Sequence, residues 1–147
     1  MAHYEQQEFC RRISAKYPKY FTGKKVLDIG SLDINGNNRF FIDSCNYIGL
    51  DVGDGPNVDV VQVAHLYDAP DEVFDLIIST EVFEHDMFYE KSIQNIIRML
   101  KPGGYFIMEH YEKQGELVRD ALSAQFSNAQ THADLNGRDR FTSARKR

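Results

Sequence analysis

Lys25-Val26-Leu27-Asp28-Ile29-Gly30-Ser31-Leu32-Asp33-Ile34-Asn35-Gly36 is the stretch that decides the fold. It begins as a short apolar run, which is typical of a buried strand, and it becomes polar after Gly30. A glycine at the end of a strand lets the backbone approach a ligand closely, because it carries no Cβ atom. The stretch therefore predicts a strand that ends in a ligand-binding turn.

A second apolar run, residues 47–50, ends in Asp51, 21 residues after Gly30. In nucleotide-binding α/β folds, a carboxylate at this place accepts hydrogen bonds from ribose hydroxyls. The stretch contains no G-x-G-x-x-G, so a dinucleotide has little support, and no G-x-x-x-x-G-K-[ST], which excludes a P-loop. We predict an adenosine site; the alternative is a plain strand-turn-strand with an aspartate cap.

Composition narrows the class of protein. A chain of 147 residues with 42% hydrophobic residues suits a single domain with one core. The net charge of −5 argues against a general nucleic-acid-binding surface. Two cysteines without metal or redox spacing favour reduced thiols and a cytoplasmic location. No run approaches the roughly 18 apolar residues of a membrane span, and the N-terminus lacks a signal-peptide pattern.

Hydrophobic periodicity predicts the remaining elements. We expect helices over residues 3–17, 37–43, 93–100 and 114–126, and further strands over 58–65, 74–80, 105–108, 128–134 and 140–144. Lys101-Pro102-Gly103-Gly104 should end the third helix and turn the chain, and Asn136-Gly137 is a hairpin signal. The link after Asp51 is too short and polar for a helix. Alternating strands and helices indicate a doubly wound sheet.

Four motifs carry a family resemblance: V-L-D-I-G-S at 26–31, the acid Asp51, F-D-L-I-I-S-T-E-V-F-E-H at 74–85, and L-K-P-G-G at 100–104. Together they resemble class I S-adenosylmethionine-dependent methyltransferases, most closely the type 11 branch, over about residues 24–110. The resemblance implies an α/β fold with a Rossmann-like, doubly wound seven-stranded sheet, mostly parallel with an antiparallel C-terminal strand. The domain would comprise residues 1–147, with an N-terminal helix within 1–22 and a C-terminal helix and strand pair within 111–147.

The same resemblance implies S-adenosylmethionine as cofactor and S-adenosylhomocysteine as product. Asp51 would bind the ribose diol, Asp28 would orient the glycine loop or the methionine amine, and Glu81 would lie at the methyl end. Val63 stands where the family usually has an adenine-binding aspartate, which leaves adenine to backbone groups or His65. The implied cofactor-binding residues are Asp28, Gly30, Ser31, Leu32, Gly36, Asp51, Val52, Ala64, His65, Thr80 and Glu81.

A second resemblance covers the C-terminal part. Residues 109–110, 114–119 and 134–142 are similar to the end of release-factor glutamine methyltransferases. That family marks its amide substrate with Asn-Pro-Pro-Tyr after the fourth strand, where this chain has Ser79-Thr80-Glu81-Val82. The likeness therefore implies completion of the fold and not glutamine methylation. A recombination of two relatives would explain the mixture.

Methyl transfer needs a general base only where the acceptor must lose a proton. His85, in Glu84-His85-Asp86, is the candidate catalytic base near neutral pH; alternatively this segment begins a loop and caps the next helix. His110 also follows a parallel strand, and the five histidines show no metal-ligand spacing. The terminal cations Arg138, Arg140, Arg145, Lys146 and Arg147 would attract an anion or RNA, or form a solvated tail.

The leading interpretation is a methyltransferase acting on a small-molecule acceptor. The alternative is a non-catalytic S-adenosylmethionine binder that serves as a sensor, scaffold or cofactor sink. The acidic charge disfavours nucleic-acid modification. The sequence indicates no membrane partner and specifies neither the acceptor atom nor an oligomeric state.

Overall fold

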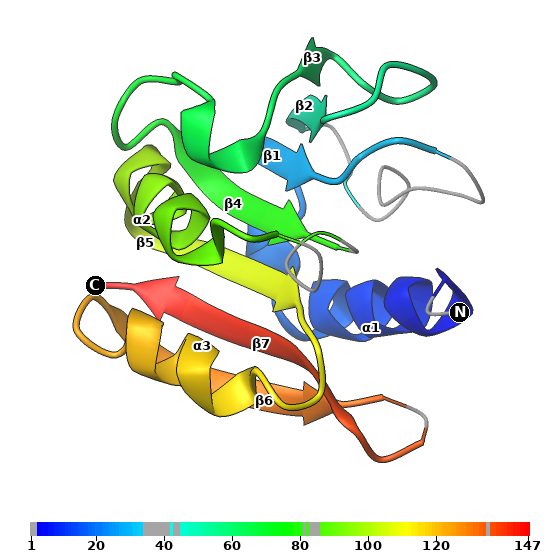
Figure 1. The fold of residues 1–147 in the computed structure, drawn as a ribbon, viewed down its shortest axis with the longest axis vertical. Helices are drawn as coiled ribbons and strands as arrows, with labels where there is room; N and C mark the ends of the chain where they lie inside the picture. The colour runs from blue at the N-terminus through cyan, green and yellow to red at the C-terminus, as the bar shows by residue number, and fades with distance from the viewer. Residues whose placement is uncertain (1–2, 34–41, 43–44, 81, 83–85, 135) are drawn as a thin grey trace.

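The computed structural model describes residues 3–33, 42, 45–80, 82, 86–134 and 136–147. One seven-stranded sheet runs through the molecule in the order β3-β2-β1-β4-β5-β7-β6 (Figure 1). Its strands are β1 (Lys25–Ile29), β2 (Asn46–Asp51), β3 (Val60–Val61), β4 (Phe74–Ser79), β5 (Leu100–Glu109), β6 (Phe126–Ala133) and β7 (Asp139–Lys146). The helices are α1 (His3–Lys16), α2 (Tyr89–Met99) and α3 (Gly115–Leu122), with 3-10 turns at η1 (Pro18–Tyr20) and η3 (Ala64–Leu66).

The pairing of the strands confirms the predicted fold class. β1, β2, β3, β4 and β5 are mutually parallel. β7 runs antiparallel to both β5 and β6, so the sheet is mixed. The carboxyl ends of β1, β4 and β5 therefore share one edge, at the right in Figure 1. In open α/β sheets this is the edge that binds ligands.

Each central strand is buried on both faces, which explains its continuous apolar sequence. Helix α1 covers one face, and α2 and α3 cover the other (Figure 1). Successive residues point alternately to the two sides. On the α1 side, Val26, Leu76 and Ile107 belong to the core that contains Phe9 and Ile13. On the other side, the core residues include Leu27, Ile77, Phe106, Ile93, Ile96, Val118 and Leu122.

The third strand is much shorter than residues 58–65. Only Val60–Val61 pairs with β2, and the chain then enters η3. The reason lies in α2, because the Asn95 side-chain amide donates to the carbonyl oxygens of Ala64 at 2.8 Å and Tyr67 at 2.9 Å. These bonds fix the segment as a turn beside α2. The link from Asp51 to β3 contains no helix, as predicted.

Residues 101–104 follow the end of the helix as predicted, but they lie within β5 instead of forming a turn before it. Helix α2 ends at Met99, as expected, but β5 begins at once at Leu100 and includes Gly103. The ladder to β4 is irregular there, and Gly103 adopts φ +81°. The irregularity accommodates the glycines within the strand.

The predicted C-terminal elements are present with shifted bounds. The helix expected over 114–126 ends at Leu122, and Phe126 instead begins β6. The Asn136-Gly137 hairpin is confirmed, with Gly137 at φ +77°. The helix expected over 37–43 lies outside the described residues apart from Ile42. Among the helices described, none is long and apolar enough to cross a membrane.

Candidate functional site

The glycine turn follows β1 at the carboxyl edge of the sheet. Its backbone is held by β2, since the amides of Gly30 and Ser31 both donate to the Leu50 carbonyl, at 2.8 and 3.1 Å. Gly30 has φ +82°, and a Cβ atom there would lie 2.4 Å from the Thr80 carbonyl oxygen and 2.5 Å from Val82 Cγ2. Only glycine therefore allows the ends of β1 and β4 to approach this closely.

Asp51 joins the end of β2 to the glycine turn. Its carboxylate accepts one hydrogen bond from the Leu32 amide at 3.0 Å and one from the Gly53 amide at 3.0 Å. The side chain is half-buried. Each oxygen accepts one of these bonds and keeps acceptor capacity for another donor. The acid and the turn, separated in sequence, thus form one local structure.

A series of side-chain hydrogen bonds connects β1 and β2 to the glycine turn. Asp28 is 1% exposed and accepts a hydrogen bond from the Tyr47 hydroxyl at 2.5 Å. The Asn57 side-chain amide donates to the Tyr47 oxygen and to the Ser31 carbonyl, both at 2.9 Å. Asp28 is therefore connected to the glycine loop through Tyr47 and Asn57, two residues that the motif reading did not select.

At the end of β3, backbone amide and carbonyl groups are hydrogen-bonded to side chains of the protein. The Val63 amide donates to the Gln62 side chain at 2.8 Å, and the Ala64 carbonyl accepts from Asn95. The half-buried His65 ring packs against Phe88, with ring centroids 4.9 Å apart. Val52, next to Asp51, is 69% exposed. Val61 and Leu66, on either side of this segment, are also exposed.

Two buried hydroxyls at the strand ends have no hydrogen-bond partner within the described part of the chain. They are the Oγ atoms of Ser31, after β1, and Ser79, at the end of β4. Buried polar atoms are usually paired, so each unpaired hydroxyl needs an explanation. Ser79 was not selected from the sequence, although a small polar residue that ends an apolar strand was the available signal.

His110 is fully buried and both of its ring nitrogens are engaged. Nδ1 lies 2.8 Å from the Tyr111 carbonyl oxygen, and Nε2 lies 2.9 Å from the Thr142 hydroxyl. Because a carbonyl only accepts, Nδ1 carries the proton and Nε2 accepts from Thr142. Thr142 also contacts Thr131, whose hydroxyl accepts from Arg119. Burial lowers the pKa of His110, and both ring nitrogens bond to groups of the protein.

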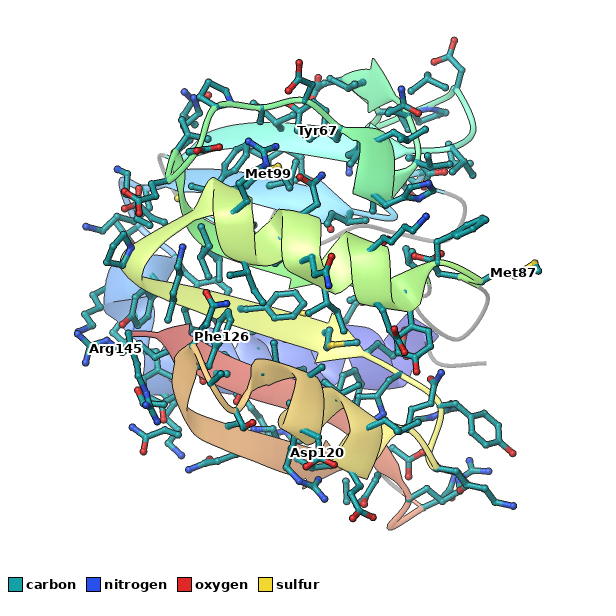
Figure 2. The ribbon with its side chains drawn as sticks, turned by 60° about the vertical axis from the view of Figure 1, so that its left-hand side comes forward. Tyr67, Met87, Met99, Asp120, Phe126 and Arg145 are labelled. Carbon is teal, nitrogen blue, oxygen red and sulfur yellow. The ribbon has the colours of Figure 1, made fainter. Side chains whose placement is uncertain are left out.

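Gly36, Glu81 and His85 lie outside the described residues. The neighbouring Asp86 is described, and its side chain bonds to residues at the start of α2. Its carboxylate accepts from the Phe88 amide at 2.7 Å and from the Ser92 hydroxyl at 2.6 Å. In Figure 2, Met87 projects at the right-hand edge, beyond the start of this helix, and it is 90% exposed. Across the described ranges, no three His, Cys, Asp or Glu side chains form a metal-binding group.

Residues 1–144 match the protein family described as a methyltransferase domain. The chain belongs to this family. The family predicted from the motifs at Gly30, Asp51 and residues 74–85 is thereby confirmed. The strand order of this methyltransferase domain also agrees with the fold that the resemblance implied.

Solved methyltransferases share this fold at low sequence identity. Against 1,6-didemethyltoxoflavin-N1-methyltransferase of Burkholderia thailandensis, crystallised with S-adenosylhomocysteine, the TM-score is 0.70 at 15% identity, covering 95% of this chain and 77% of the other. For phosphoethanolamine N-methyltransferase 2 of Haemonchus contortus in complex with S-adenosylmethionine, the TM-score is 0.73 at 16% identity. The match covers 95% of this chain and 52% of that protein. For the N-methyltransferase NodS of Bradyrhizobium japonicum, the TM-score is 0.69 at 15% identity, and the match covers 98% of this chain and 97% of that protein.

Among curated proteins, the chain is similar to release factor glutamine methyltransferases over a short segment. It is 45% identical over 53 residues to that of Bifidobacterium longum, which is 35% of this chain and 18% of the relative. It is 41% identical over 51 residues to that of Streptomyces coelicolor, covering 33% and 18%. The match thus spans about a fifth of the length of these relatives.

Proposed function

We propose that the chain is an S-adenosylmethionine-dependent methyltransferase that acts on a small-molecule acceptor and yields S-adenosylhomocysteine. One observation carries the proposal. In a chain that matches the methyltransferase family over residues 1–144, the Asp51 carboxylate at the end of β2 accepts a hydrogen bond from the Leu32 amide of the glycine turn. The ribose-binding acid and the turn that the resemblance implied are therefore in contact.

The residues present fit an adenosine-bearing ligand. Asp51 is anchored by two amides and retains acceptor capacity for the two hydroxyls of a ribose. Ser31 and Ser79 hold buried hydroxyls that lack a partner in the described chain. Val52 presents an apolar side chain directly after Asp51. A polar ligand with an apolar ring matches this combination of groups.

Each residue has a distinct part in the proposal. Asp51 holds the ribose, the loop over residues 30–32 holds the methionine portion, and Val52 with His65 borders the adenine. When bound, S-adenosylmethionine supplies an electrophilic methyl group on a sulfonium. The chain has to orient the acceptor and, where the acceptor is protonated, remove one proton. His85 keeps that role as a proposal, because His110 has no free ring nitrogen.

Calorimetric titration tests the cofactor. We expect S-adenosylmethionine and S-adenosylhomocysteine to bind, and NAD and ATP not to bind. Asp51→Asn should weaken the binding of both sulfur ligands by about 1–3 kcal/mol, because a charge-assisted hydrogen bond is lost. The matched control is Asp54→Asn, an exposed acid three residues away, which should bind normally. Equal affinity of Asp51→Asn and the wild-type chain would exclude the proposed ribose position.

A protein acceptor is the second candidate, supported by the 45% identity over 53 residues to a release factor glutamine methyltransferase. The segment Ser79-Thr80-Glu81-Val82, in place of Asn-Pro-Pro-Tyr, favours the small-molecule acceptor. Transfer of a radiolabelled methyl group to a purified release factor, compared with transfer to a protein-free metabolite extract, separates the two.

A non-catalytic binder is the remaining alternative, and the engaged ring nitrogens of His110 favour it. Such a protein would bind S-adenosylmethionine but form no S-adenosylhomocysteine with any acceptor fraction. Chromatographic measurement of S-adenosylhomocysteine therefore distinguishes an enzyme from a sensor or scaffold.

A further inference from the structure

A hollow of about 210 Å³ lies at the opposite edge of the sheet from the proposed cofactor site. It is bordered by the segment before β1, the first residues of β4 and β5, and the last residues of β7. Three cationic side chains line it, Lys19, Lys24 and Arg145. Figure 2 places Arg145 at the left-hand edge, far from Met87 at the right. The fold thus brings together cations from both ends of the chain.

The positive charge in this hollow is unmatched. Asp75 is the one acid that lines it, and its carboxylate already accepts from the Lys25 amide at 3.0 Å and lies 3.4 Å from Lys101 Nζ. Within the part of the chain that the structure describes, no ion pair joins Lys19, Lys24 or Arg145 to an acid. Three free cations meet in one place on a chain whose net charge is −5.

Tyr20, which lines the hollow, is held by contacts with β5. Tyr20 is buried and stacks on Tyr105, with ring centroids 5.0 Å apart and an interplanar angle of 17°. Its hydroxyl donates to the Gly103 carbonyl at 3.1 Å. Lys19 Nζ lies 5.0 Å above the Tyr20 ring, a cation–π contact that keeps the ammonium at the rim.

Gly103 lines the hollow beside Arg145. It adopts φ +81°, and a Cβ atom at this position would lie 3.7 Å from Arg145 Nη2. Because Gly103 has no side chain, the space between it and the planar donor group of Arg145 is open to a ligand atom.

We propose that this hollow binds a phosphate group, either inorganic phosphate or a small phosphate monoester. A guanidinium donates two parallel hydrogen bonds to phosphate oxygens, and lysine ammonium groups add point charges. Converging cations also raise the local concentration of anions. This binding site lies at the opposite edge of the sheet from the proposed cofactor site.

Nuclear magnetic resonance on the full chain tests the proposal. Inorganic phosphate and glycerol 3-phosphate are titrated at constant ionic strength, balanced with sodium chloride. We expect saturable shifts of the Tyr20, Gly103 and Gly104 amide signals. Tighter binding of glycerol 3-phosphate identifies a monoester site, and equal binding identifies a phosphate site. Absent shifts, or shifts that rise linearly with concentration, would overturn the proposal.

Variants then locate the anion. Arg145→Gln and Lys19→Gln should each weaken phosphate binding about five- to tenfold, through loss of a partly exposed charged contact. Lys113→Gln removes an equally exposed lysine at the other edge and should leave binding unchanged. Equal weakening by Lys113→Gln, or normal binding by Arg145→Gln, would mean that the effect is only general surface charge. Titration of each variant with S-adenosylmethionine reports the cofactor site independently.

Discussion

Replacing Gly30 by alanine tests whether the close approach of β1 and β4 requires a residue without a side chain. Two costs follow from the structure. The backbone at φ +82° is left-handed, which costs an alanine about 1–2 kcal/mol. The added Cβ atom would also lie 2.4 Å from the Thr80 carbonyl oxygen and 2.5 Å from Val82 Cγ2. Because the first contact is backbone, it cannot be relieved by a rotamer change.

Overpacking of this kind costs about 1–3 kcal/mol, so Gly30→Ala should lose about 2–5 kcal/mol of the free energy of unfolding. Two other glycines provide matched controls. Gly23 at φ +66° and Gly137 at φ +77° have no atom within 4 Å of an added Cβ. Gly23→Ala and Gly137→Ala should therefore show only the backbone cost of about 1–2 kcal/mol.

Urea denaturation followed by circular dichroism measures all three variants. The comparison is valid where the slope of the free energy with urea is the same, because that slope reports the surface exposed on unfolding. The difference between Gly30→Ala and the mean of the two controls isolates the steric term. If Gly30→Ala is no less stable than Gly23→Ala, the contact between the two strand ends is not as tight as the structure indicates.

Three further predictions concern stability. Burial lowers the pKa of both His110 and His132, so the unfolded chain binds protons more readily than the folded one. The free energy of unfolding should therefore be highest above about pH 6.5 and fall as the pH drops below it. Urea midpoints measured from about pH 8 to pH 5.5 check this. Asp86→Ala should cost about 0.5–2 kcal/mol through loss of its bonds at the start of α2, and Asp54→Ala, at an exposed acid outside the helices, serves as control. Lys146→Met should cost about 1–3 kcal/mol, because Lys146 Nζ donates at 2.6 Å to two carbonyl oxygens at the end of α2, and thermal melting checks it.

The sheet was predictable because its signals are local. Apolar runs such as residues 74–80, bounded by turn residues, identify buried strands without knowledge of their neighbours. The length of β3 was not predictable in this way. It depends on the Asn95 amide, which binds the Ala64 carbonyl from more than 30 residues away. Similarly, the start of β5 at Leu100 depends on pairing with Phe74, which places the glycines that follow the helix inside a strand.

The site was predictable only in outline. The spacing of Gly30 and Asp51 indicated a shared site, and Asp51 does bond to the loop after Gly30. The hydrogen-bonded chain through Tyr47 and Asn57 was missed, because it joins side chains from segments that no local pattern relates. The basic hollow was missed for the same reason, since Arg145 was interpreted as part of a C-terminal run of cations.

Alternate residues of β2 explain why the loop and the following link hold together. Tyr47 lies between Asp28 and Asn57, and Asp51 lies between the amides of Leu32 and Gly53. Between them, a side chain at Gly49 would lie 2.2 Å from the carbonyl oxygen of Asn57. The polar groups on this face of the strand thus bond to the glycine loop and to the link to β3, while the Tyr47 ring also packs against the core on the α1 side. A site arranged in advance loses less entropy on binding a ligand, so Tyr47 and Gly49 support the proposed cofactor site by holding the loop and the link in place.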